Sequence, residues 1–231
     1  MVKENLALCQ QKLKVAAVKT GRSCEEVLLV AVIKGVLTPF IHEAIDAGIE
    51  HLGENRVQEA LLRYESLNAY AHKSGQRLSW HMVGHLQTNK VKEAVKIFDL
   101  IHSVDSIDVA VEIDKQAARL HKIQNVLIQV NTSYEAAKFG FTLETVEEAV
   151  KEISVFKNTH MKGLMTIAPL VDNLEEARIF FRRLKELKDR INQSGNSPLT
   201  ILSMGMTDDF EVAVEEGANM VRIGRGLFAG L

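Results

Sequence analysis

Cysteine and proline are scarce in this chain. The two cysteines, Cys9 and Cys24, have neither the number of a disulfide framework nor the spacing of a thiolate metal site. A reducing compartment is therefore predicted, and we expect the cytoplasm. The three prolines are Pro39, Pro169 and Pro198, and no Pro-, Gly- or Ser-rich linker divides the sequence. We therefore expect one domain over residues 1–231.

The sequence also lacks a charge excess and a long apolar run. It has 28 basic and 30 acidic residues, a formal net charge of −2, which offers no basic surface for nucleic acid. Its apolar runs stay well below the roughly 20 residues that cross a bilayer. Its first residues include Lys3 and Glu4 and carry no apolar signal core. We expect neither a nucleic-acid nor a membrane partner.

What the sequence does have is a regular alternation of short apolar runs with longer amphipathic segments. An apolar stripe at spacings of three and four predicts a helix over residues 1–20. Eight strand-like runs then follow: Val27–Ile33, Ile49–Gly53, Leu78–Gly84, Leu100–Val104, Val126–Asn131, Met161–Ala168, Leu199–Gly205 and Met220–Gly224. Strands that alternate with helices indicate right-handed crossovers and a parallel sheet.

This pattern predicts the fold class α/β. Eight strands in about 230 residues suit a (β/α)8 TIM barrel over residues 27–228, with the first helix as an N-terminal extension. A doubly wound open sheet is the alternative, because periodicity does not distinguish a closed sheet from an open one.

Lys34 directly follows the most apolar run of the chain, Val27–Ile33. Two interpretations are open. In an apolar site, desolvation would favour the neutral amine, a nucleophile that forms Schiff bases with aldehydes and ketones. At the rim of a sheet, the lysine would instead keep its charged head in water.

Polar residues gather where the predicted strands end, which is where α/β folds carry their chemistry. Two of them, Lys34 and Arg222, are cations and suggest an anionic ligand. The loops after the last two strands offer the hydroxyl, glycines and guanidiniums that bind phosphate, namely Ser203, Gly205, Arg222, Gly224 and Arg225. A phosphate site at one wall and a reactive lysine at another indicate a phosphorylated carbonyl compound: pyridoxal 5′-phosphate or a sugar phosphate.

Motifs along nearly the whole chain resemble the pyridoxal phosphate homeostasis protein family, single-domain relatives of the alanine racemase N-terminal barrel. The matching segments are Leu29–Lys34, Gly53–Glu59, Trp80–Lys90, His102–Ser106, Gln129–Ser133, Lys138–Gly140, Gly163–Ile167, Leu202–Asp209 and Val221–Gly224. Four positions depart from the family pattern: Ile33, Gly35-Val36, Arg56 and Arg225.

The resemblance implies roles for particular residues. Lys34 would hold pyridoxal 5′-phosphate (PLP) as an aldimine, Ser203 and Gly224 would bind its phosphate, and Asn55 would lie against the cofactor. Arg222 would face the pyridine nitrogen or the phosphate, and Arg225 could also contact the phosphate. We expect His81 beside the cofactor, and no metal, because Gly84 and the strand pattern spoil a helical zinc pair of His81 with His85.

The resemblance implies a PLP carrier that contributes to intracellular cofactor homeostasis and exchanges PLP with apo-enzymes. The sequence ends at Leu231, shortly after the last strand, so we do not expect the second domain that a racemase of this type uses. A PLP enzyme acting on amino acids, such as a racemase or decarboxylase, is the alternative. A cofactor-free Schiff-base aldolase is a further one.

Overall fold

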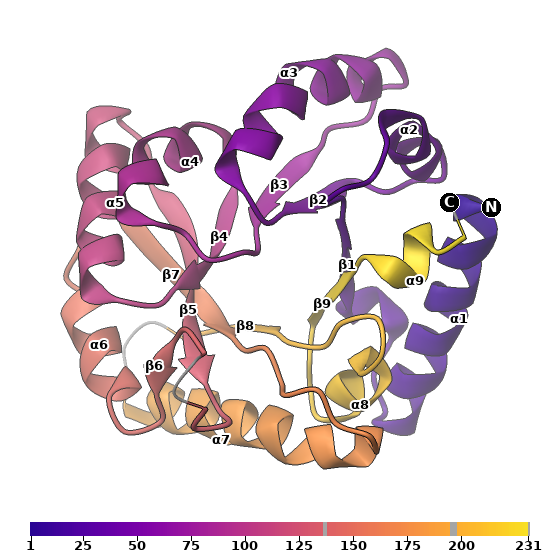
Figure 1. Ribbon diagram of the computed structural model, residues 1–231. Helices are drawn as coiled ribbons and strands as arrows, with labels where there is room; N and C mark the ends of the chain where they lie inside the picture. Colours follow the sequence, from indigo (N-terminus) through magenta and orange to yellow (C-terminus); the bar gives the residue numbers. More distant parts are fainter. Residues whose placement is uncertain (136–137, 195–197, 231) are drawn as a thin grey trace.

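Eight parallel strands close into a barrel in the computed structural model, which describes residues 1–135, 138–194 and 198–230 (Figure 1). They are β1 (Leu28–Val32), β2 (His51–Glu54), β3 (Ser79–Met82), β4 (Leu100–Val104), β5 (Gln124–Asn131), β7 (Thr159–Met165), β8 (Ile201–Ser203) and β9 (Met220–Ile223). Their order is β4-β3-β2-β1-β9-β8-β7-β5, and pairing of β4 with β5 closes the ring. The predicted (β/α)8 barrel is confirmed, and the open-sheet alternative is wrong. A short strand that we did not predict, β6 (Phe141–Thr142), pairs with β5.

Helices surround the barrel on its outer side (Figure 1). They are α1 (Val2–Lys19), α2 (Thr38–Asp46), α3 (Val57–Lys73), α4 (Val91–Ile97), α5 (Ile107–Arg119), α6 (Val146–Ile153), α7 (Arg178–Ser194), α8 (Phe210–Glu215) and α9 (Arg225–Phe228), with 3-10 turns η1 (Cys24–Glu26), η2 (Thr88–Lys90) and η3 (Leu174–Ala177). The predicted N-terminal helix is α1. It packs against α8 and α9, where Asn5 Nδ2 donates to the Leu227 carbonyl at 3.0 Å. In the described ranges, no helix has the length and apolar character that crossing a bilayer requires.

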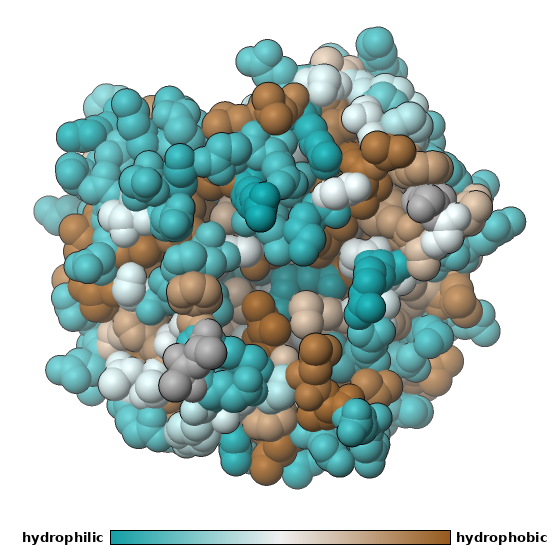
Figure 2. All heavy atoms as spheres, viewed as in Figure 1, coloured by the Kyte–Doolittle hydropathy of each residue, from teal (hydrophilic) through white to brown (hydrophobic). Residues whose placement is uncertain are grey.

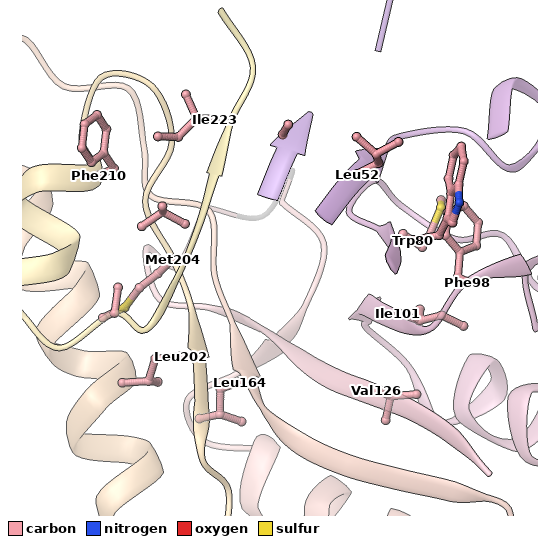
Figure 3. Packing of buried hydrophobic residues seen from close by; sticks show 14 of the residues in the cluster. Leu52, Trp80, Phe98, Ile101, Val126, Leu164, Leu202, Met204, Phe210 and Ile223 are labelled. Carbon is pink, nitrogen blue, oxygen red and sulfur yellow. The ribbon is translucent and has the colours of Figure 1, made fainter. Parts of the chain in front are cut away.

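Alternation along the strands decides what faces the helices and what faces the barrel interior. Trp80, Ile101 and Leu202 belong to the large apolar cluster between barrel and helices, part of which is drawn in Figure 3. The neighbouring residues His81, His102 and Ser203 therefore point to the other face, into the barrel. A smaller buried cluster contains Val30, Leu100, Leu127, Met165 and Met220. By the same alternation, Leu100 shares a face with His102, and Met220 shares one with Arg222. Buried polar side chains thus share the interior with this apolar layer.

Candidate functional site

Two cavities meet at the end of the barrel where the strands finish, and Figure 2 shows a hollow at the centre of this face. The larger cavity has a volume of about 660 Å³ and the smaller one of about 410 Å³. Lys34 and Asn55 line both cavities. The larger one is also lined by Thr207, Arg222, Gly224 and Arg225, and the smaller one by Arg56, Gln58, His85 and Lys90. This is the end at which α/β barrels carry their chemistry.

Lys34 lies at the rim of the cavities rather than in the core. β1 ends at Val32, and Ile33 is fully buried, with its N–H donating to the Gly53 carbonyl at 2.9 Å. The next residue, Lys34, is exposed. The interpretation that apolar surroundings desolvate this amine is therefore wrong. The rim interpretation is right, because the chain leaves the barrel at this point and the long side chain reaches water.

Arg222 forms the buried wall of the larger cavity. Its side chain projects from β9, and the residue is only 3% exposed. Nη1 donates to the Ser203 hydroxyl at 2.7 Å, and Nη2 donates to the Thr166 carbonyl at 2.8 Å. Burial lowers the pKa of Arg222 to about 10, so the guanidinium stays charged at neutral pH. The cavity that Lys34 lines thus also has a fixed, buried cation in its wall.

Gly224 and Arg225 follow Arg222 and also line the larger cavity. A Cβ on Gly224 would come 3.4 Å from the Val32 carbonyl oxygen, so the backbone passes close to the end of β1. Arg225 is different from Arg222: its exposed guanidinium pairs with Asp208 at 2.6 Å. It contributes a solvated, partly neutralised charge, which is a weaker electrostatic element than the buried Arg222.

Ser203 and His81 lie deeper than the other predicted site residues. Ser203 is fully buried, and its Oγ accepts from Arg222 and lies 2.9 Å from His102 Nδ1. His81 is 2% exposed and stands between two other imidazoles, with Nδ1 2.9 Å from His102 Nε2 and Nε2 3.0 Å from His51 Nδ1. A phosphate contact by Ser203 and a cofactor contact by His81 stay predictions.

Loops after β2 and β3 come so close together that only glycine fits between them. A Cβ on Gly84 would lie 2.3 Å from the carbonyl oxygen of Asn55 and 2.7 Å from its Cα. No real Cβ contact is that short, so the absence of a side chain at Gly84 is what lets the Asn55 loop take its place on the wall of both cavities.

Sequence reasoning assigned no role to three residues that support the site: His102, Glu54 and Arg63. Glu54 is fully buried at the end of β2, and its desolvation raises the pKa to about 7 despite the nearby Arg63 guanidinium. His102 is also fully buried, and burial holds the pKa of its imidazole well below the usual value. The signal that would have found His102 is a large polar residue at an inward-facing position of a fully buried strand.

The predicted separation of His81 from His85 is seen directly. His85 stands in the loop after β3, where Nδ1 lies 2.7 Å from Asp105 Oδ2, whereas His81 points into the barrel. Among residues 1–135, 138–194 and 198–230, no group of three His, Cys, Asp or Glu side chains could hold a metal ion.

Comparisons of the sequence with known proteins agree on one group of relatives. The family described as "Alanine racemase, N-terminal domain" matches residues 8–231. The pyridoxal phosphate homeostasis protein of Aquifex aeolicus is 41% identical over 97% of this chain and 96% of its own length. Its Escherichia coli counterpart is 36% identical over 98% of this chain and 95% of its own length.

Solved structures agree with this relationship. PipY of Synechococcus elongatus with PLP bound superposes with a TM-score of 0.86 at 33% identity, covering 99% of this chain and 100% of PipY. The crystal structure of an unknown protein from Bifidobacterium adolescentis gives a TM-score of 0.93 at 32% identity, covering 98% of this chain and 94% of that chain. Alanine racemase of Clostridium difficile, at 17% identity and a TM-score of 0.74, shares the fold over 57% of its own chain.

The fold and the matched family define a barrel of the alanine racemase N-terminal type. Within that class, the chain belongs to the pyridoxal phosphate homeostasis protein family, as the identity and coverage of its relatives show.

Proposed function

We propose that this chain binds PLP in the larger cavity, with Lys34 as the amine that holds it covalently, and contributes to PLP homeostasis in the cytoplasm. The observation that carries the proposal is that Lys34, Arg222 and Gly224 line one cavity of about 660 Å³. That volume lies within the roughly 300–1,000 Å³ usual for small-molecule sites. PLP supplies an aldehyde that condenses with a primary amine, and a phosphate that cations and backbone N–H groups bind.

The residues present fit such a ligand. Lys34 offers an accessible amine at the rim, and Arg222 offers a buried, charged guanidinium in the wall of the same cavity. Gly224 adds a backbone without a side chain, which a ligand can approach closely, and Thr207 adds a hydroxyl. The names of the Aquifex and Escherichia relatives and the PLP-bound state of PipY support the same ligand.

Borohydride reduction tests the covalent part of the proposal. We expect purified protein saturated with PLP to show a visible absorbance band that borohydride removes, and peptide mapping to find the label on the peptide containing Lys34. The Lys34→Ala variant should fold and lack the band. Lys138→Ala is the matched control, because Lys138 lies in the loop after β5, where its amine pairs with Glu135 at 2.9 Å. A label on any other peptide overturns the assignment.

We further propose that PLP passes from this protein to apo-enzymes that need it. The support is the exposed position of Lys34, where an aldehyde bound to its amine would be accessible to another amine from solvent. Loaded protein mixed directly with an apo-enzyme should activate it faster than the same amount of loaded protein kept behind a dialysis membrane, which only free PLP crosses. Equal rates in both arrangements would show that transfer proceeds only through free PLP. Incubation with amino acids should give no turnover.

A further inference from the structure

Five polar side chains form one continuous line of hydrogen bonds through the barrel interior. His51 Nδ1 lies 3.0 Å from His81 Nε2, His81 Nδ1 lies 2.9 Å from His102 Nε2, and His102 Nδ1 lies 2.9 Å from Ser203 Oγ. Arg222 Nη1 completes the line at 2.7 Å from the same Ser203 oxygen. The bond between His102 on β4 and Ser203 on β8 joins strands that are not neighbours in the ring, so it crosses the interior.

The line begins and ends in different surroundings. Arg222 lies on the wall of the larger cavity, at the end where the strands finish. His51 is the first residue of β2 and lines a separate cavity of about 240 Å³ with Glu50, Arg77 and Asp99, at the opposite end of the barrel. Between them, His81 is 2% exposed, and His102 and Ser203 are fully buried.

Each imidazole in this line is neutral and therefore has one donor and one acceptor nitrogen. Burial lowers the pKa of His81 to about 3 and holds that of His102 well below its ordinary value. A neutral imidazole has two tautomers, with the proton on Nδ1 or on Nε2, and the hydrogen-bond partners determine which one is present.

Arg222 decides the direction. A guanidinium only donates, so the Ser203 oxygen must accept from Arg222. If the Ser203 hydroxyl then donates to His102 Nδ1, His102 carries its proton on Nε2 and donates to His81, and His81 donates from Nε2 to His51. In the reverse arrangement, His102 donates to Ser203, and the Ser203 proton has no other acceptor within the described part of the chain. A buried hydroxyl proton without a partner is unfavourable, so the first arrangement is the stable one.

We propose that His102, supported by His81, is a positioning residue that orients Arg222 toward the cofactor cavity through the Ser203 hydroxyl. This inference rests on the proposed function, since it takes the larger cavity as the cofactor site. His102 Nδ1 accepts a hydrogen bond from the Ser203 hydroxyl, which leaves the Ser203 oxygen to accept from Arg222 Nη1. The Thr166 carbonyl accepts from Arg222 Nη2. The buried cation is thereby fixed in the cavity wall instead of turning among several partners.

The proton positions can be measured in cofactor-free protein by ¹⁵N NMR of histidine-labelled samples. We expect His81 and His102 each to be a single tautomer at pH 7, protonated on Nε2. In Ser203→Ala, the group that sets the direction is removed, so both rings should become mixtures of tautomers while the fold is kept. Exposed His72 on α3 is the internal reference. A wild-type His102 protonated on Nδ1, or unchanged single tautomers in Ser203→Ala, overturns the proposal without reference to any cofactor.

Two substitutions at His102 test the effect on the cavity. A glutamine can accept from Ser203 and donate to His81, whereas a leucine of similar size can do neither. We expect His102→Leu to weaken PLP retention about tenfold, as the loss of one hydrogen bond to a charged group would give, and His102→Gln to restore it to within about threefold of wild type. Equal retention in wild type, His102→Leu and His102→Gln overturns the positioning role.

The same samples separate this inference from the proposed function. At saturating PLP, borohydride should still label Lys34 in both His102 variants, because the amine itself is unaltered. Labelling that fails in the wild type contradicts the proposed function, whereas retention that is insensitive to His102 contradicts only the positioning role. Circular dichroism of each variant shows that it is folded, and if His102→Leu does not fold, the wild-type tautomers and Ser203→Ala decide the question.

Discussion

The guanidinium of Arg63 joins Glu54 to Ile33. Its Nη1 donates to Glu54 Oε1 at 3.2 Å and to the Ile33 carbonyl at 3.0 Å. Ile33 directly precedes Lys34, and Glu54 directly precedes Asn55, whose N–H donates to Glu54 Oε2 at 3.2 Å. The ion pair therefore ties together the ends of β1 and β2 that carry the two residues shared by both cavities.

Glu54 should make stability depend on pH. Its folded pKa is raised to about 7, so the folded state binds more protons than the unfolded state between pH 4.5 and 7. Its contribution to stability is therefore present at low pH and lost as pH rises through this window. Denaturant unfolding of Glu54→Gln and wild type should show the variant gaining about 3 kcal/mol relative to wild type between pH 5 and 8, at about 1.4 kcal/mol per unit of pKa shift. A difference that stays constant with pH contradicts the raised pKa.

The buried histidines should make stability change with pH in the direction opposite to the effect of Glu54. Burial lowers the pKa of His81 to about 3 and that of His102 well below its usual value, so the unfolded state binds more protons below pH 6.5. Stability should then fall as pH drops, by about 1.4 kcal/mol per pH unit for each histidine within the window. His102→Gln removes one such group. Its denaturant midpoint should fall less than that of wild type between pH 6 and 4.5, while exposed His72→Gln should follow wild type.

Arg222 and Arg225 both line the larger cavity, and we expect very different effects from their removal. Arg222→Ala deletes a buried cation with two hydrogen bonds and should weaken PLP retention at least tenfold. Arg225→Ala deletes an exposed charge already paired with Asp208 and should change retention by less than about threefold. Equilibrium dialysis with PLP compares them. Similar losses in both variants would contradict this difference and would mean that the exposed arginine contributes as much to retention as the buried one.

Two glycines of the site should respond differently to alanine. Gly84→Ala would drive a Cβ into the Asn55 backbone at 2.3 Å, so we expect destabilisation of about 1–3 kcal/mol from overpacking. Gly224→Ala meets the Val32 carbonyl at 3.4 Å, an ordinary contact, and should keep its stability while reducing PLP retention. Thermal unfolding and dialysis give the two readouts. A Gly84→Ala protein as stable as wild type would contradict the close approach of the two loops.

The strands and the site wall were largely predictable because their signals are local. Every predicted apolar run overlaps a strand, and β4 begins and ends at the predicted residues, Leu100 and Val104. Lys34, Asn55, Arg222, Gly224 and Arg225 line the larger cavity because the ends of parallel strands share one edge. Their contacts with PLP stay predictions, as do those of Ser203 and His81.

The depth of each side chain was not predictable in the same way. Lys34 follows an apolar run and is nevertheless exposed, since the chain leaves the barrel at that residue. Glu54 lies in a polar stretch of the sequence that also contains Glu50 and Glu59, and it is nevertheless fully buried. Exposure depends on where the loops after neighbouring strands pass, and those loops are distant in the sequence.

Sequence alone determined the alternation of strands with helices and the residues at the strand ends, because hydrophobic period and chain order are local properties. Only closure of the barrel decided that His102 meets Ser203, 101 positions further along, and that Arg63 reaches both Glu54 and Ile33. Such contacts depend on strand register and on which residues of each strand face inward. Both are set only when β4 pairs with β5 and the ring is complete.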